Sequence, residues 1–207
     1  MGGALIMIAV LYLAHGINGR TTIALLGTLG TLAVTAALAA AFVAATRLTG
    51  GASEEAIYVQ VLSSKVDLSG LLLGGIVIGS LGVLNDVTVT QASAVWEIHI
   101  ANSSRGIVAL WRSGMRVGRD HIASVVYTLV LAYAGASLPL LLIFSTSHLS
   151  ATNLLTSEIV AEELVRGLVG SIGLVASVPV TTALAPFVVT RSGTGPMAPT
   201  VTADPIA

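Results

Sequence analysis

The feature that most constrains this chain is the length of its uncharged apolar segments. Residues 21–46, rich in alanine, leucine and valine, contain no charged side chain. A helix needs about 20 apolar residues to cross the hydrocarbon core of a bilayer. A transmembrane β-barrel would instead alternate apolar and polar residues in segments of about ten. The segment therefore predicts a membrane-spanning helix.

The composition extends this prediction to the whole chain. Charged residues make up 9% of the 207 residues and hydrophobic residues 55%, and the mean hydropathy is +0.94. Soluble domains carry about 25% charged residues, so we predict an all-α, polytopic transmembrane helical bundle. The net charge is −1 and the basic residues are scattered, which argues against nucleic-acid binding.

The hydropathy pattern predicts about five spans and no soluble domain. The predicted segments are 2–16, 21–46, 68–96, 121–146 and 165–190. Because the first is too short to cross a bilayer, we expect that the natural start lies upstream or that this segment inserts only partly. We expect residues 1–191 to form one transmembrane domain, and the Gly/Pro/Thr-rich residues 192–207 to form a disordered tail.

The third segment runs past Asn85 and Asp86 without ending. A central aspartate costs a membrane helix roughly 2.5–3.5 kcal/mol on insertion scales, so it should face protein or water. Small and polar side chains recur every three or four residues on one helical face, namely Gly75, Gly79, Gly82, Asp86, Thr90, Ser93 and Glu97. We predict that this face points into the interior of the bundle.

Two geometries fit the length of this segment. A continuous helix over 68–96 would be about 43 Å long, which exceeds the roughly 30 Å hydrocarbon core. The helix must then tilt or protrude, or else break near residues 82–85 and line a cavity. Pro139 and Pro179 predict kinks in the last two spans.

Two sets of residues are candidate sites. Small residues allow close helix approach in membranes, which predicts helix packing at Gly75, Gly79, Gly82, Gly135, Gly167 and Gly170. The polar side chains predict a pathway lined by Asn85, Asp86, Thr90, Ser93, Glu97 and His121. For Asp86, a cation-responsive site and a structural hydrogen bond both fit. His121, which follows Asp120, is also explained as the start of a helix.

Basic residues concentrate in the connection after the third span. Arg105, Arg112, Arg116 and Arg119 recur at helical spacing with apolar residues between them. This pattern predicts an amphipathic interfacial helix whose arginines contact lipid phosphates, although a solvated loop fits equally well. A similar surface helix is predicted at 152–164. Because cytoplasmic loops carry excess lysine and arginine, we predict the N-terminus outside and the C-terminus in the cytoplasm.

Catalytic and metal-binding motifs are not found in the sequence. There is no G-x-S-x-G, H-E-x-x-H or Walker loop, and there are no cysteines. We therefore expect neither an enzyme nor a metal or cofactor site. The expected partners are the lipid bilayer and another membrane chain, either a second copy or a different protein.

Three strings of the sequence are distinctive in combination: LLLGGIVIGSLGVLNDVTVTQASAVWEI (71–98), GRDHIASVVYTLVLAYAGASLPLLLIF (118–144) and EIVAEELVRGLVGSIGLVASVPVTT (158–182). Together they resemble the YibE/F family of bacterial multi-pass membrane proteins, over about residues 5–190. The resemblance implies a location in the bacterial cytoplasmic membrane. It also implies an activity that is at most permease-like, without an established substrate.

Two functions fit these observations. The first is permease-like transport of a small solute or ion through a polar bundle interior. The second is a non-transporting membrane scaffold or assembly factor, in which the polar faces serve only for packing. A measurement of flux through the reconstituted protein separates the two.

Overall fold

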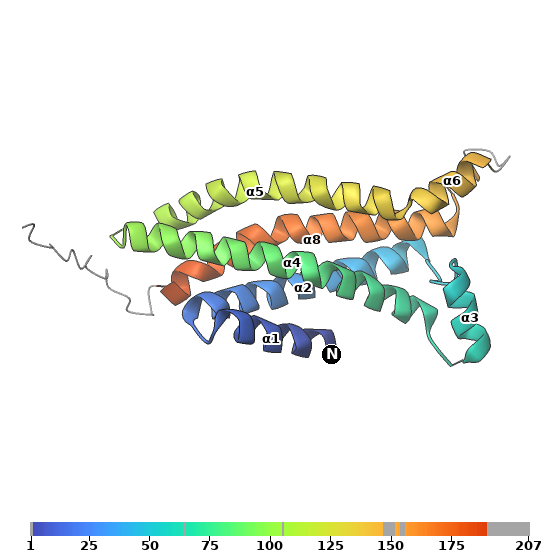
Figure 1. Ribbon diagram of the computed structural model, residues 1–207, viewed down its shortest axis with the longest axis horizontal. Helices are drawn as coiled ribbons and strands as arrows, with labels where there is room; N and C mark the ends of the chain where they lie inside the picture. The colour runs from blue at the N-terminus through green and yellow to red at the C-terminus, as the bar shows by residue number, and fades with distance from the viewer. Residues whose placement is uncertain (1, 64, 105, 147–151, 154–155, 190–207) are drawn as a thin grey trace, which may run out of the picture.

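The computed structural model describes residues 2–63, 65–104, 106–146, 152–153 and 156–189 (Figure 1). Its helices are α1 (Gly2–His15), α2 (Gly19–Thr46), α3 (Glu54–Leu62), α4 (Leu68–Ala101), α5 (Ile107–Ala136), α6 (Leu138–Thr146) and α8 (Glu158–Val189). The described residues contain no strand, which confirms the predicted all-α fold. The predicted tail, residues 192–207, lies outside the described part of the chain.

The helices form an elongated bundle with α2, α4 and α8 at its centre. α5 packs along α4 and α8, α1 folds back against α2, and α3 stands apart at one end (Figure 1). α2 runs antiparallel to α8, because Gly27 faces Thr181 while Thr35 faces Gly173. Three helices therefore share one long interface.

Three of the described helices, α2, α4 and α8, are long and apolar enough to cross a membrane. α5 and α6 together make a fourth if the bent pair counts as one span. α1 has 14 residues, which is about 21 Å of helix against a hydrocarbon core of roughly 30 Å. The expectation of about five spans, with a short first one, therefore agrees roughly with the structure.

α4 decides between the two geometries predicted for the third span, because it is one unbroken helix of 34 residues. The Asp67 side chain caps its start by accepting a hydrogen bond from the Ser69 backbone N–H at 3.1 Å. The helix is about 51 Å long, so about 20 Å exceeds the hydrocarbon core unless the helix tilts. The sequence position of Asp86 therefore does not by itself place it deep in the bilayer.

The sequence predicted an arginine-bearing interfacial helix distinct from the fourth span, and this prediction is wrong. One continuous helix, α5, covers both, and it meets α6 at a bend of 49°. The bend lies just before Pro139, as expected for a residue that disfavours helical geometry on its N-terminal side. α8 continues through Pro179 without a break. Residues 158–164 belong to α8 and do not form a separate surface helix.

Glycine and threonine interlock α2 with α8. A Cβ atom added to Gly27 would lie 3.2 Å from the Cβ of Thr181, and one added to Gly173 would lie 3.3 Å from the Cβ of Thr35. Each helix thus presents a glycine to a threonine of the other. This arrangement brings two backbones close together, which is how small residues favour helix association in membranes.

The connection after α2 has an unusual backbone that fixes it to α8. Arg47 adopts φ 53° at the end of α2, and Gly50 has φ +74°. A Cβ at Gly50 would collide with the Leu68 carbonyl group, so glycine is required there. Thr49 donates hydrogen bonds from its backbone N–H and from Oγ1 to Glu158 Oε1, the second at 2.7 Å. The connection is thereby held against the first turn of α8.

We expect Gly173→Ala to destabilise the protein, because the added methyl group overlaps Thr35. Overpacking of this kind costs about 1–3 kcal/mol. The matched control is Gly79→Ala on the exposed face of α4, where nothing lies within 4 Å of an added Cβ. Thermal unfolding in detergent, followed by light scattering, should show a lower midpoint for Gly173→Ala only. A larger loss in Gly79→Ala would contradict the helix arrangement.

Candidate functional site

Six hydroxyl side chains lie in the interface between α2, α4 and α8, and we call them the hydroxyl seam. Each is fully buried, with 0% of its surface exposed; they are Thr28, Thr31, Thr35, Thr88, Ser177 and Thr181. They belong to the three helices that are apolar enough to span a membrane. The seam therefore gives these helices a polar interior.

Most of these hydroxyl groups donate to a carbonyl group of their own helix. Thr31 donates to the Gly27 carbonyl oxygen at 2.7 Å, and Thr35 donates to that of Thr31 at 2.9 Å. Thr28 and Thr88 also bond to each other through their hydroxyl oxygens, which joins α2 to α4. Thr181 Oγ1 is buried and has no hydrogen-bond partner among the described residues. The donors are thus mostly satisfied, while oxygen lone pairs remain within the seam.

Apolar clusters close the seam at both ends. Ile23, Ala92 and Val95 belong to the cluster on one side. Val43, Ile76 and Val169 belong to the cluster on the other. The seam therefore lies between two apolar layers, and a third apolar cluster, which includes Val87 and Val178, lies beside it.

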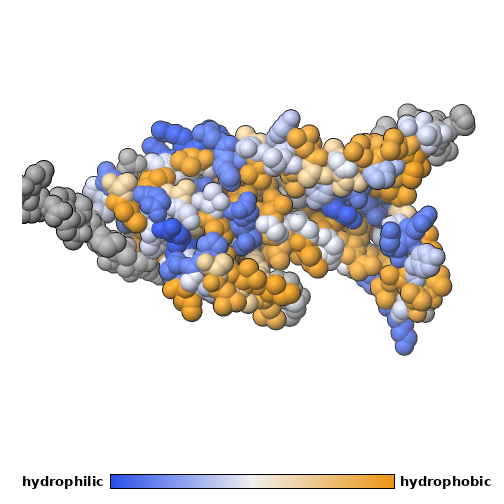
Figure 2. All heavy atoms as spheres, in the orientation of Figure 1, coloured by the Kyte–Doolittle hydropathy of each residue, from blue (hydrophilic) through white to orange (hydrophobic). Residues whose placement is uncertain are grey.

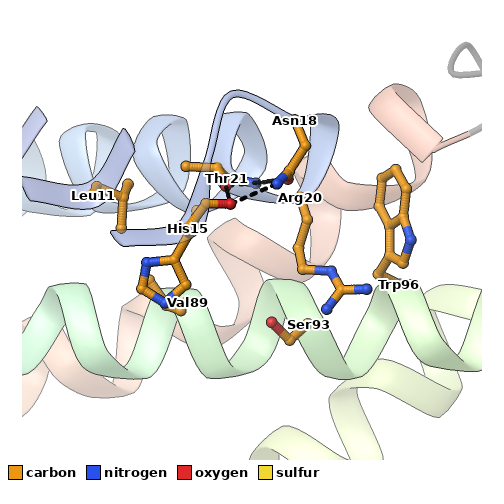
Figure 3. Close-up of a pocket in the computed structure, with 9 residues that line it drawn as sticks. Leu11, His15, Asn18, Arg20, Thr21, Val89, Ser93 and Trp96 are labelled. Atoms are coloured by element: carbon orange, nitrogen blue, oxygen red, sulfur yellow. Dashed lines mark hydrogen bonds between the residues drawn. The ribbon is translucent and has the colours of Figure 1, made fainter. Parts of the chain in front are cut away.

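A cavity of about 300 Å³ borders the first apolar cluster, where α1, α2 and α4 meet (Figure 3). Arg20 extends from α2 toward α4, where it forms an ion pair with Glu97 at 2.8 Å. Its guanidinium carbon lies 5.9 Å from the centre of the Trp96 ring. Asn18 caps α2 by accepting from the Thr21 backbone N–H at 2.9 Å. The cavity thus combines a positioned cation with polar side chains from three helices.

Gln91 is the polar residue that joins three helices. Its Nε2 donates to the Gly114 carbonyl oxygen of α5 at 2.9 Å and to Thr182 Oγ1 of α8 at 2.7 Å. A Cβ at Gly114 or Gly118 would collide with side chains of α4 and α8, including that of Gln91. This Gly114-xxx-Gly118 pair was visible in the sequence. Its role in helix packing was not predicted, because the arginines around it indicate a surface helix.

The predicted polar pathway residues are not brought together. Ser93 lines the cavity shown in Figure 3, and Glu97 pairs with Arg20 at its edge. Asp86 and Thr90 are exposed, and Asp86 lines a separate groove of about 380 Å³ between α4 and α5. The remaining two, Asn85 and His121, each bury an atom that lacks a hydrogen-bond partner among the described residues.

The predicted orientation of the α4 glycine face is also wrong within this chain. Nothing lies within 4 Å of a Cβ added at any of Gly75, Gly79, Gly82, Gly135 and Gly167. Only Gly170 is buried, with Tyr133 Oη 3.7 Å and Ser80 Oγ 3.8 Å from an added Cβ. The buried face of α4 carries Ile76, Leu84 and Gln91. Two faces of α4 carry small or polar residues, and a helical wheel does not show which of them meets the other helices.

The arginine side chains gather over the first half of α5, where Figure 2 shows a hydrophilic patch. Arg112, Arg116 and Arg119 are exposed, and with Trp111 they line a shallow pocket of about 310 Å³. Arg105 lies outside the described residues. Contact between these arginines and lipid phosphates stays a prediction. Among the described residues, no group of three or more His, Asp or Glu side chains could hold a metal ion.

The sequence matches the family described as YibE/F-like protein over residues 1–191. No curated protein and no solved structure shows significant similarity to the chain. The apolar helices and this match, which covers most of the sequence, agree with each other. The chain therefore belongs to the YibE/F-like protein family and is a membrane protein.

Proposed function

We propose that this protein is a permease-like transporter of a small ion or solute, and that the hydroxyl seam is its pathway. The observation that carries the proposal is the full burial of six hydroxyl side chains between three membrane-type helices. Oxygen atoms inside a membrane protein replace the hydration shell of a permeating ion or polar solute. The same side chains also allow close helix packing, so flux through the seam is the test of the proposal.

The two apolar clusters explain why such a pathway is closed in this structure. A polar centre between two apolar layers is the arrangement of an occluded transporter, which opens to one side at a time. The cavity at Arg20 borders the first layer, because Leu11 and Ala24 of that cluster line it. Movement of α1 relative to α2 and α4 would connect it with the seam.

We also propose that the chain lies in the bacterial cytoplasmic membrane with its N-terminus outside and its C-terminus in the cytoplasm. Arg20, Arg112, Arg116 and Arg119 lie in the half of the bundle where α2 and α5 begin, which we call the basic half. The opposite end, where α3 lies and α8 begins, carries most of the acids and is called the acidic end: Glu54, Glu55, Glu158, Glu162 and Glu163. The acidic end also carries Arg47, Lys65 and Arg166, but the four arginines of the basic half outnumber them, which favours a cytoplasmic location of that half.

Labelling of single cysteines tests this orientation, because the chain has no cysteine of its own. Ser63→Cys follows α3, and Ser103→Cys lies between α4 and α5; both positions are exposed. In intact cells, a membrane-impermeant maleimide should label Ser63→Cys but should label Ser103→Cys only after lysis. The unmodified chain is the control and should stay unlabelled. The reverse pattern would overturn the orientation.

A specific observation favours the second candidate, a membrane scaffold. Gly75, Gly79 and Gly82 leave one face of α4 bare, so a helix of another chain can approach it closely. Asp86 and Thr90 continue this face as exposed hydrogen-bonding groups. In a scaffold, this face would carry the function and the hydroxyl seam would serve only for packing.

Flux through reconstituted protein separates the two candidates. Thr88→Val removes the hydroxyl that pairs with Thr28 and keeps the shape of the side chain. We expect it to lower flux of H⁺, ²²Na⁺ or ⁸⁶Rb⁺ about tenfold, the effect of roughly 1.4 kcal/mol on the barrier. The matched control is Thr46→Val, because Thr46 is exposed and also bonds to its own helix, at the Phe42 carbonyl oxygen.

The same assay includes two further variants. Asp86→Asn should leave flux near the wild-type level, because Asp86 lies outside the seam. Gly79→Leu fills the bare face of α4 and should also leave flux intact. Background flux in the wild type, together with loss of self-association only in Gly79→Leu, would reject transport and favour the scaffold.

A further inference from the structure

A second cavity lies at the acidic end and contains an unpaired carboxylate. It has a volume of about 160 Å³. Its lining includes Gly50, Ser53, Glu55, Glu162 and Arg166. Glu162 is 8% exposed, and its Oε1 atom is buried without a hydrogen-bond partner in the described part of the chain. A buried carboxylate is unfavourable unless it is paired, bound to a cation or protonated.

The neighbouring charged groups leave Glu162 Oε1 without a partner, although the Ala52 backbone N–H donates a hydrogen bond to the same carboxylate. Glu158 is already occupied by Thr49, which donates two hydrogen bonds to it. Arg166 Nη1 pairs with Glu163 at 3.3 Å, although Arg166 Nε is itself buried and unpartnered. Glu55 of α3 faces the same cavity. Two carboxylates, Glu55 and Glu162, and one guanidinium group therefore line the site, so its net charge is negative.

The surrounding backbone gives this cavity a fixed wall. Gly50 requires glycine because of its positive φ and its contact with the Leu68 carbonyl group. The hydrogen bonds from Thr49 to Glu158 hold the same connection against α8. The Glu162 side chain thus lines a space bounded by the α2–α3 connection and by α4. It does not face a freely moving loop.

We propose that Glu162 binds one monovalent metal cation, Na⁺ or K⁺, in this cavity. A divalent metal ion would need more negatively charged ligands, and no group of three or more His, Asp or Glu side chains among the described residues could hold a metal ion. The volume accommodates an ion with a few waters, since a water in the liquid occupies about 30 Å³. Identifying this cation with the ion that passes through the hydroxyl seam rests on the proposed transport function.

A direct ion pair between Glu162 and Arg166 is the competing explanation, because they are one helical turn apart on α8. The two explanations differ in whether the unmodified chain binds a cation. Under the proposal, Arg166→Gln removes a repulsive charge, so cation binding should persist or tighten. With an ion pair, Arg166→Gln should create cation binding that the wild type lacks.

The test is equilibrium binding of ²²Na⁺ and ⁸⁶Rb⁺ to the full chain in phosphatidylcholine nanodiscs. We expect saturable binding of one ion per chain, displaced by NaCl or KCl but not by N-methylglucamine chloride. Glu162→Gln should weaken binding at least about tenfold, and Glu162→Asp should weaken it less. Glu54→Gln is the control, because Glu54 is exposed on α3 and does not line the cavity. Elution profiles check that each variant is folded.

Absence of saturable binding in the wild type, or equal binding in Glu162→Gln, would overturn the site. This outcome is separable from failure of the transport proposal. Ion binding without Thr88-sensitive flux would reject transport and keep the site. Thr88-sensitive flux without binding at Glu162 would reject the site and keep transport.

Discussion

The arrangement of this protein depends on the close approach of α2 and α8 at reciprocal glycine–threonine contacts. In a bilayer, burial of apolar surface does not favour contact between helices, since lipid chains are equally apolar. Gly27 against Thr181, and Thr35 against Gly173, give the two backbones a tight fit along one line. The same contacts bring the hydroxyl groups inside. Packing and polarity thus have one origin here, because threonine is both the side chain that fits the glycine and the source of the buried oxygen.

This contact determines where the other elements can lie. α4 joins α2 through Thr28 and Thr88, and α5 is joined by Gln91 at Gly114. The arginines of α5 then face outward because Gly114 and Gly118 face inward. At the acidic end, the connection between α2 and α3 closes over the start of α8 and encloses Glu162. Charged groups therefore lie beyond or beside the apolar clusters, and hydroxyl groups lie between them.

The sequence predicted the elements of this fold better than their faces. Uncharged length identified the spans, and Pro139 marked the bend between α5 and α6, because both depend on local chemistry. The orientation of α4 could not be obtained in this way. In water an apolar face turns inward, but in lipid both an apolar face and a glycine face can meet either lipid or protein. The pattern therefore predicts the α4 glycines inside, whereas Ser80, Thr88, Gln91 and His99 are the buried polar residues of that helix.

Disulfide formation between pairs of introduced cysteines tests the central contact most directly, because the chain contains no other thiol. Cβ atoms at Gly27 and Thr181, or at Thr35 and Gly173, would lie 3.2 Å and 3.3 Å apart, close to the roughly 3.5–4.5 Å of disulfides. The account predicts that Gly27→Cys with Thr181→Cys, and Thr35→Cys with Gly173→Cys, form intramolecular disulfides on mild oxidation, detected by mass spectrometry of peptides. Gly79→Cys with Gly173→Cys should stay reduced. Cross-linking of the Gly79 pair, with the first two pairs left reduced, would contradict the account.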